Sequence, residues 1–222
     1  MNKNVTDKII GYSFLVVSLI ALGGCIQDLT QKNIVYANDF EKGDTTGILF
    51  ENFFGPIKYN KIINYNGSNV LGTFNNTRFT IKLDSLPEHN TISVEFILNI
   101  HDKWEGDHVV TNNTPDLWVM KFNDNPVLTT TFSNTSFKQS YPNFYPSPNP
   151  YPAKGNAFDI GLPGLCSLKG VFGGTSSYRI IKTVPHDGSK FKFDCSDALQ
   201  PFNDSCAKSW SIDNLTIAAI KY

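Results

Sequence analysis

The chain has no surplus of positive charge and carries little charge overall. Its 222 residues include 19 lysine and arginine residues against 20 aspartate and glutamate residues, so the formal net charge is -1. Binding to nucleic acid or to an anionic lipid surface is typically accompanied by a basic surplus, so the composition argues against both partners. Aromatic residues make up 13% of the chain, which favours a sheet-rich fold because bulky rings pack well on a pleated face.

After its N-terminal segment the chain also lacks any hydrophobic run long enough to cross a bilayer, which takes roughly 20 residues. It lacks a window of helical length in which apolar residues recur with the 3.6-residue period of a helix. In the clearest segment, 91–100, apolar residues instead fall on every second position. A strand with one buried face requires this period of two. Similar but shorter segments predict further strands at 34–37, 70–74, 78–83, 116–122, 127–132, 178–184, 190–194 and 209–220.

Many short strands separated by turn residues predict an all-β domain over residues 34–222, built as a two-sheet antiparallel jelly-roll sandwich. Residues 141–156 contain five prolines, which cannot take part in a central sheet ladder, so we expect a long extended surface loop there. Aromatic faces can stack on sugar rings, so the candidates for ligand contact are Trp118, Tyr141, Tyr145 and Tyr151. The alternative for the three tyrosines is that they cover one edge of the sandwich.

The N-terminal segment combines a basic start with an uncharged apolar run that is too short to span a membrane. Lys3 and Lys8 begin it, the apolar residues 9–22 follow, and Gly23-Gly24-Cys25 close it. Such a run has the length of the hydrophobic region of a secretory signal. The ending resembles the lipobox of bacterial and some archaeal lipoproteins, in which the cysteine is acylated and becomes the new N-terminus.

This resemblance implies a signal peptide at 1–24, a lipid on Cys25 and a tether over residues 25–33. The exported protein would then be attached to the membrane at the cell surface through its N-terminal lipid. The alternative is an ordinary signal peptide, or a short anchor helix, with an incidental cysteine.

Three more cysteines are present if Cys25 carries lipid, and in an oxidising compartment one disulfide is expected among them. Cys195 and Cys206 flank a short loop rich in aspartate, proline and asparagine, which favours this pair. Cys166 would then be buried and free, or paired between molecules. Metal binding by the three cysteines has less support, because no Cys-x-x-Cys or histidine-rich spacing accompanies them.

Acidic residues gather near both ends of the predicted domain. Asp39 and Glu41 lie in the segment Asn-Asp-Phe-Glu, and Asp213 lies in the segment Ser-Trp-Ser-Ile-Asp-Asn-Leu. The first and last strands of a jelly roll commonly pair, so we expect these carboxylates to converge. Calcium takes roughly 6 to 8 oxygen ligands, many of them carboxylates. We therefore predict a structural calcium ion that joins the two ends of the domain.

A third acidic cluster, at Asp102, Glu105 and Asp107, directly follows the clearest predicted strand. Carboxylates spaced along a glycine-containing loop suit calcium, because the loop can wrap around the ion. Asp116 could reach the same ion from a neighbouring strand. The spacing differs from that of an EF-hand. The alternative is a solvated acidic turn.

The two terminal acidic motifs together resemble the concanavalin A-like and MAM-type extracellular jelly rolls, in which such motifs hold a structural calcium. Over residues 38–220 the chain also resembles a poorly characterised bacterial secreted domain of this kind. The motifs that carry this resemblance include Leu71-Gly72-x-Phe74, His101-Asp102-x-Trp104-Glu105-Gly106-Asp107, Pro115-Asp116-x-Trp118, Pro185-His186-x-Gly188-Ser189 and Trp210-Ser211-Ile212-Asp213-Asn214.

Catalytic relatives of that fold carry a Glu-x-Asp-x-x-Glu motif on one strand, because retaining glycoside hydrolysis needs two carboxylates about 5 to 5.5 Å apart. This chain has no such motif. We therefore predict a non-catalytic module that binds a carbohydrate or a surface glycoprotein. One alternative is a structural or adhesive surface protein that binds other proteins through the proline-rich loop. The other is a divergent glycoside hydrolase or lyase that uses His101, Asp102, Glu105 and Asp107.

Overall fold

The computed structural model describes residues 30–57, 61–109, 114–200 and 204–222. The predicted signal peptide, Cys25 and residues 25–29 of the tether lie outside the described residues. Within the described residues every regular element is a strand, and no helix has the length and apolar character needed to cross a membrane. Residues Lys32–Lys221 form one compact unit, and the fold below is that of this unit.

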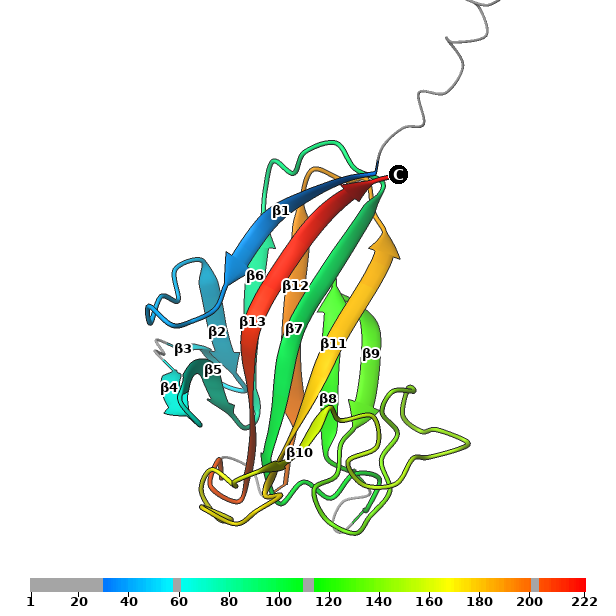
Figure 1. Ribbon diagram of the computed structural model, residues 1–222. Helices are drawn as coiled ribbons and strands as arrows, with labels where there is room; N and C mark the ends of the chain where they lie inside the picture. The colour runs from blue at the N-terminus through cyan, green and yellow to red at the C-terminus, as the bar shows by residue number, and fades with distance from the viewer. Residues whose placement is uncertain (1–29, 58–60, 110–113, 201–203) are drawn as a thin grey trace, which may run out of the picture. The chain divides into compact units, whose positions relative to one another are not determined.

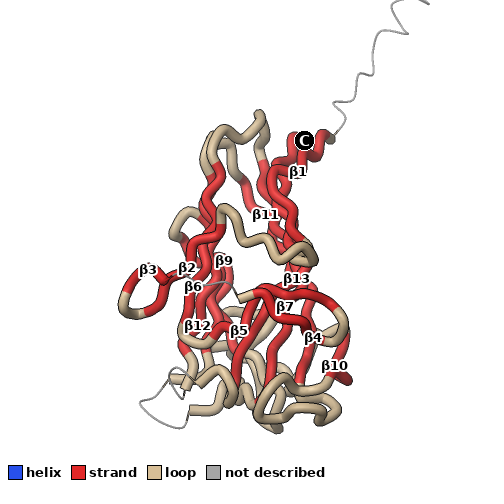
Figure 2. The backbone as a smooth tube through the Cα atoms, turned by 90° about the vertical axis from the view of Figure 1, so that its left-hand side faces the viewer, coloured by secondary structure: helices blue, strands red, loops and turns tan. Residues whose placement is uncertain are grey.

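The strands form two antiparallel sheets, which Figure 2 shows edge-on as two layers. The order of strands in the first sheet is β10 (Asp159–Leu162), β11 (Thr175–Pro185), β7 (Thr91–Asp102), β13 (Lys208–Lys221), β5 (Ser68–Phe74) and β4 (Ile62–Tyr65), and β1 (Gln31–Asn38) also pairs with β13. The order in the second sheet is β3 (Gly55–Ile57), β2 (Ile48–Asn52), β6 (Thr77–Leu83), β12 (Phe191–Ala198), β8 (Leu117–Phe122) and β9 (Asn125–Thr131).

Two stretches of the chain cross repeatedly between the sheets. The chain passes from β6 in the second sheet to β7 in the first and back to β8, and it repeats this crossing through β11, β12 and β13 (Figure 1). This connectivity is typical of a jelly roll. The predicted all-β, two-sheet antiparallel jelly-roll sandwich is therefore confirmed.

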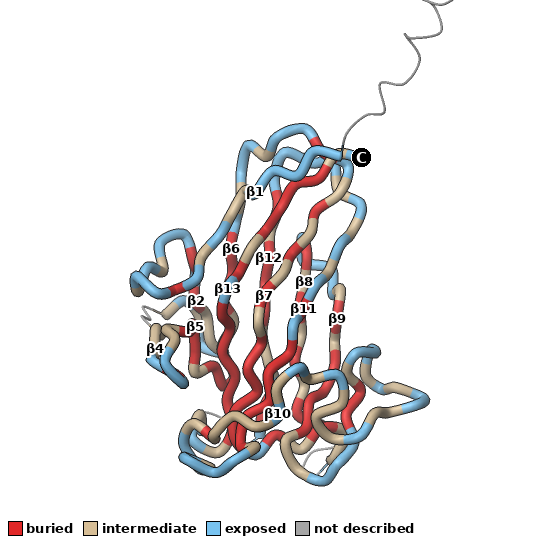
Figure 3. The backbone as a smooth tube through the Cα atoms, viewed as in Figure 1, coloured by how far each residue is buried: buried red, intermediate tan, exposed pale blue. Residues whose placement is uncertain are grey.

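The core lies between the two sheets, where alternate residues of each strand point inward. On β7 the predicted inward residues are at most 1% exposed: Ile92, Val94, Phe96, Leu98 and Ile100. Figure 3 shows this burial along β7 and β13. Four short strands were not expected from the sequence, namely β2, β3, β4 and β10.

Trp118 belongs to this core, so its prediction as a ligand contact is wrong. It is 0% exposed and packs against Phe96, Phe132 and Trp210, with ring centroids 5.9 to 6.2 Å apart. The reason is its position on β8, where Trp118 shares the inward face with Met120 and Phe122. An aromatic ring in this position stabilises the sandwich and cannot stack on an external sugar.

The predicted Cys195–Cys206 disulfide is also wrong, because the structure joins Cys166 to Cys206. Cys195 is a buried free thiol on β12, on the same inward face as Phe191 and Phe193. A side chain that points between the sheets cannot meet a cysteine in the loop before β13. The bond instead joins the loop after β10 to the loop before β13.

The proline-rich segment 141–156 is an irregular loop, as predicted, with a single bridge between Tyr151 and Gln139. Tyr141 is half-buried and packs on Phe132 and Tyr178, with ring centroids 4.8 and 5.1 Å away. Tyr141 therefore covers part of the core, which agrees with the alternative interpretation of the loop. Tyr145 and Tyr151 are also partly exposed.

Candidate functional site

The two acidic ends of the domain meet beside strand β5. The Ser68 hydroxyl lies 2.6 Å from Glu41 Oε1 and 3.1 Å from Asp213 Oδ2. A serine hydroxyl has one proton, so it can donate to only one of these oxygens at a time. The backbone N–H of Asn69 donates a further bond of 3.1 Å to Glu41 Oε1. Carboxylates that are 172 positions apart in the sequence thus share one hydroxyl.

A turn anchored by Phe40 sets the position of Asp39 and Glu41. Phe40 is 0% exposed, and its backbone adopts a positive φ of 59°. The side-chain oxygen of Asn38 accepts the Phe40 N–H at 2.8 Å, which stabilises the turn. Because the Phe40 ring is buried in the core, its two acidic neighbours lie at the surface.

A bulge in β13 sets the position of Asp213. The pairing of β13 with β7 shifts register between Asp213 and Thr216, and Asn214 has a φ of 52°. A bulge bends the strand and re-aims a side chain. Asp213 is 8% exposed, and its Oδ1 accepts the N–H of Asn214 at 2.7 Å.

The electrostatics of this region favour a cation. Burial raises the pKa of Asp213, and the negative charges of Glu41 and Asp39 raise the pKa further, whereas hydrogen bonds from Asn214 and Ser68 lower it. Across the parts of the chain that the structure describes, no lysine, arginine or histidine forms an ion pair with any of the three. The three carboxylates are hard oxygen donors, which is the chemistry that calcium prefers.

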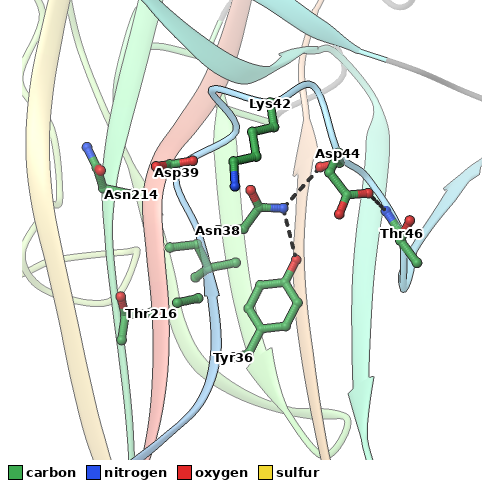
Figure 4. Close-up of a pocket in the computed structure, with 10 residues that line it drawn as sticks. Tyr36, Asn38, Asp39, Lys42, Asp44, Thr46, Asn214 and Thr216 are labelled. Atoms are coloured by element: carbon green, nitrogen blue, oxygen red, sulfur yellow. Dashed lines mark hydrogen bonds between the residues drawn. The ribbon is translucent and has the colours of Figure 1, made fainter.

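An open pocket of about 490 Å³ lies next to this acidic meeting point (Figure 4). It is formed by β1, the loop that follows β1 and the bulge of β13. Its lining residues are Tyr36, Ala37, Asn38, Asp39, Lys42, Asp44, Thr46, Asn214, Leu215 and Thr216. Asp39 therefore belongs both to the pocket and to the acidic meeting point.

Asn38 organises one side of the pocket. Its amide nitrogen donates to the backbone oxygen of Asp44 at 3.0 Å and to the hydroxyl of Tyr36 at 3.4 Å, as Figure 4 shows. Its oxygen accepts the Phe40 N–H, so both amide hydrogens and one lone pair of the oxygen are used inside the protein. The Tyr36 oxygen acts as an acceptor here, and its proton remains available to a ligand. Burial raises the pKa of Tyr36, which keeps that proton in place at neutral pH.

Asp44 provides a carboxylate acceptor at the rim. Hydrogen bonds from the Thr46 side chain and backbone lower its pKa, so the group is ionised at neutral pH. Lys42 adds a cationic donor, and Asn214 adds an amide from the opposite side, on β13. The pocket thus combines an aromatic ring with donors and acceptors from three segments of the chain.

The carboxylates of the third acidic cluster and Asp116 do not converge on one point. Glu105 and Asp116 bind the ammonium group of Lys208 at 3.0 and 2.8 Å, and Lys208 is only 4% exposed. Asp107 instead accepts hydrogen bonds from the hydroxyls of Thr131 and Ser140. The predicted calcium site at Asp102, Glu105, Asp107 and Asp116 does not fit, because a protein cation and protein donors already neutralise these groups.

Asp102 serves the loop that carries the disulfide. It is 0% exposed, has a φ of 64°, and accepts the N–H groups of Cys166 at 3.1 Å and Leu168 at 2.9 Å. Burial raises the pKa of Asp102, and these N–H bonds lower it. Asp102 therefore holds the loop in place, rather than facing a ligand.

His101 does not suit the alternative hydrolase. It is 0% exposed, and its two ring nitrogens contact the hydroxyls of Thr175 at 3.1 Å and Ser211 at 2.8 Å. Burial lowers its pKa to about 3, so it stays neutral at physiological pH. Because a general acid must hold a proton near the working pH, His101 cannot act as one here.

No group of three histidine, cysteine, aspartate or glutamate side chains within the described ranges is arranged to hold a metal ion by itself. At Asp39, Glu41 and Asp213, further oxygen ligands such as backbone carbonyls or waters would have to complete a calcium shell. The sequence-based prediction named Asp39 but missed Tyr36, Asn38, Lys42, Asp44 and Asn214. Asn38 and Asn214 each stand next to an aspartate within the two acidic motifs, and this position was the available signal.

No protein-family model and no curated protein sequence matches the chain. Among solved structures it is similar to a family 35 carbohydrate binding module from Clostridium thermocellum, with a TM-score of 0.32, 7% identity, and coverage of 84% of this chain and 97% of that one. It is also similar to the K3 cleaved adhesin domain of Lys-gingipain from Porphyromonas gingivalis, with a TM-score of 0.38, 13% identity, and coverage of 83% and 98%. Similarities this low transfer no function to this chain.

Proposed function

We propose that the domain is a non-catalytic module that binds carbohydrate in the pocket between β1, the loop after β1 and the β13 bulge. The observation that carries the proposal is the set of groups that line the pocket: the Tyr36 ring and hydroxyl, the Lys42 ammonium and the carboxylates of Asp39 and Asp44. A sugar presents many hydroxyl groups that both donate and accept hydrogen bonds, together with apolar C–H faces. A concave site with a few convergent polar groups and an aromatic ring matches that chemistry.

The pocket is better suited to binding than to turnover. Glycoside hydrolysis needs one carboxyl group that keeps its proton near neutral pH and one that is ionised. The pKa of Asp44 is lowered by hydrogen bonds from Thr46, so this group accepts hydrogen bonds and does not supply a proton. The Tyr36 hydroxyl, whose pKa is raised, is a hydrogen-bond donor to a sugar oxygen.

A glycan array followed by titration of the best glycan tests the proposal. We expect the wild-type domain to bind, and Tyr36→Ala to weaken binding by roughly 30-fold, which corresponds to about 2 kcal/mol. Tyr145→Ala is the matched control, because Tyr145 lies in the proline-rich loop and does not line the pocket. Loss of binding in the control but not in Tyr36→Ala would contradict the pocket, and an array without any hit would contradict the function.

We also propose that calcium binds where Asp39, Glu41 and Asp213 meet. Two observations support this: Glu41 and Asp213 compete for the single proton of Ser68, and the pKa of Asp213 is raised partly by the charges of its two acidic neighbours. A divalent cation would neutralise this excess charge. The ion would supply positive charge that holds the first and last strands together.

Chelation measures this effect. Calcium at about 100 times its dissociation constant adds about 2.7 kcal/mol, so we expect EDTA to lower the melting temperature by roughly 5 to 10 °C. Asp213→Ala should abolish the EDTA effect, whereas Asp124→Ala, at an exposed carboxylate paired with Lys192, should preserve it. An unchanged wild-type melting temperature in EDTA would rule out this calcium site.

We propose in addition that the protein is exported and held at the cell surface by lipid on Cys25. Stable anchoring takes two lipid signals, which diacylglycerol plus an amide-linked chain would provide. Cells grown with radioactive palmitate should label the wild-type protein, and Cys25→Ser should lose the label. Label retained in this variant would contradict the attachment site.

A further inference from the structure

Two histidines join the loops at one end of the sandwich. His89 lies in the loop between β6 and β7, and His186 lies in the loop between β11 and β12, which both turn at the upper end in Figure 1. His89 Nε2 is 2.8 Å from His186 Nδ1, and His89 is 5% exposed. Neither the proposed carbohydrate site nor the proposed calcium site uses this pair.

The two rings meet edge to edge. Their planes are inclined by 13° and their centroids are 5.0 Å apart. This separation is close to the largest that two imidazole rings can have when their facing nitrogens are 2.8 Å apart. The in-plane lone-pair directions of the two facing nitrogens therefore point almost straight at each other.

The outer nitrogens show how many protons the pair can hold. His89 Nδ1 is 2.6 Å from the carbonyl oxygen of Pro87, which can only accept, so this nitrogen carries a proton. His186 forms a hydrogen bond with the backbone of Lys190, and this bond must use Nε2 because Nδ1 faces His89. His89 Nδ1 and His186 Nε2, the outer nitrogens, are thus both protonated. If no proton lay between the rings, the lone pairs of His89 Nε2 and His186 Nδ1 would face each other in contact. Two protons there would collide, so one proton fits.

We propose that His89 and His186 share a single proton, and that this imidazole–imidazolium pair is an acid-sensitive latch between the β6–β7 and β11–β12 loops. A metal ion does not fit the same gap, because zinc-to-nitrogen bonds are about 2.0–2.1 Å long and need more room along this line. A second proton would break the bond between the rings and place two positive charges side by side. Acidification therefore opens the latch.

The charged groups around the histidine pair do not prevent its opening on acidification. Asp187 faces His186 and favours its protonated form. The other charged side chains of the two loops are committed to ion pairs, Lys190 with Asp84 at 3.5 Å and Glu88 with Lys221 at 2.8 Å. On the core side the His186 ring contacts the uncharged ring of Phe191, with centroids 5.4 Å apart.

The direction of the pH effect follows from His186. Burial lowers its pKa, and the adjacent His89 lowers it further, which outweighs the opposite effects of Lys190 and Asp187. The unfolded chain, with histidine pKa values of about 6.5, therefore binds more protons at mildly acidic pH than the folded chain does. Below that value stability falls as the pH drops, because the unfolded chain takes up a second proton that the folded pair excludes.

Backbone hydrogen bonds also connect the latch to the end of β13, the last strand along the chain. The N–H of His186 donates to the Asn90 carbonyl at 3.1 Å, and the N–H of Asn90 donates to the Ile220 carbonyl at 3.0 Å. The Leu86 N–H crosses between the loops to Ser189 O at 2.9 Å. Opening of the histidine pair should therefore loosen both loops and the end of β13.

Thermal melts between about pH 7 and about pH 5 test the latch, with His89→Gln as the variant. The glutamine amide reaches the position of Nε2 and keeps one bond to His186 without titrating. We expect the wild-type protein to lose roughly 3 to 5 °C more than His89→Gln over this range. His108→Gln, at a histidine stacked on Phe137, is the matched control and should keep the wild-type loss. Parallel pH profiles for wild type and His89→Gln would overturn the proposal.

A proton spectrum of the wild-type protein gives a test that needs no variant. A shared proton should produce a strongly downfield N–H resonance coupled to a histidine ring nitrogen near neutral pH, and this resonance should disappear on acidification. Independent titration of two histidines without such a resonance would also overturn the proposal.

Discussion

Lys208→Met should destabilise the domain by about 3 to 5 kcal/mol, because it leaves a buried carboxylate without its cation. The Lys208 and Asp116 side chains are each 5% exposed and lie 2.8 Å apart. Burial raises the pKa of Asp116, and Lys208 is the largest influence that lowers it. Chemical denaturation at neutral pH measures the loss. Glu105, whose side chain is 32% exposed, should matter less because water screens its charge.

Two further variants separate the loss of the charge pair from simple loss of packing. Adding Asp116→Asn to Lys208→Met removes the stranded charge, so the double variant should recover part of the stability. Arg78→Met breaks a half-exposed pair with Glu51, 3.7 Å long, and should cost less than about 1 kcal/mol. If Lys208→Met proves as mild as Arg78→Met, the buried pair does not hold the acidic loop.

Reduction of the Cys166–Cys206 disulfide should cost about 4 kcal/mol, because the bond closes a loop with a sequence separation of 40 residues. For a domain of this size the loss corresponds to a fall in melting temperature of roughly 8 to 16 °C. Melts with and without dithiothreitol measure the effect. The N–H groups of Cys166 and Leu168, in the loop after β10, donate to the Asp102 carboxylate. This loop should lose order at the same time.

The three cysteines give this experiment its own controls. Cys206→Ala should have a low melting temperature that no longer responds to reductant. Cys195→Ala should keep the full response to reductant, because Cys195 is a buried thiol outside the bond. A Cys195→Ala variant that is insensitive to reductant would show that Cys195 takes part in the bond after all.

The strands that could be predicted from the sequence are those whose pattern reflects burial on one face. Residues 91–100 carry an apolar residue at every second position, and β7 extends over Thr91–Asp102. Four short strands were not predicted, namely β2, β3, β4 and β10, because three to five residues are too few to show a period. The partner strand places each of them: β3 and β6 for β2, β2 for β3, β5 for β4 and β11 for β10.

Two errors came from giving composition more weight than alternation. Trp118, Met120 and Phe122 occupy every second position of one predicted strand. Phe191 and Phe193 do the same in the predicted strand 190–194, and Cys195, one residue beyond it, continues the alternation. Both patterns place the residue in question inside the sandwich. The actual disulfide joins two loops, and the spatial proximity of loops leaves no period in the sequence.

The candidate site could be predicted only in part. Pairing of the first and last strands indicated that Asp39, Glu41 and Asp213 would approach one another, and Glu41 and Asp213 share the Ser68 hydroxyl. The pocket itself depends on a bulge and on two residues with positive φ, Phe40 and Asn214. Such backbone detail is set by tertiary packing. The pairing of Lys208 with Glu105 and Asp116 could not be predicted, because a lone lysine in a sequence does not indicate which carboxylates it will contact.

The place of β13 in the first sheet has a consequence for how the molecule is assembled. β13 is the last strand along the chain, yet it lies between β7 on one side and β5 and β1 on the other. Without it the sheet falls into two separate pieces, β10-β11-β7 and β5-β4, and β1 has no strand to pair with. Contacts between such distant segments make folding slow. The first sheet can therefore form as one sheet only when residues 208–221 are available, so the two pieces cannot join before the end of the chain has been made.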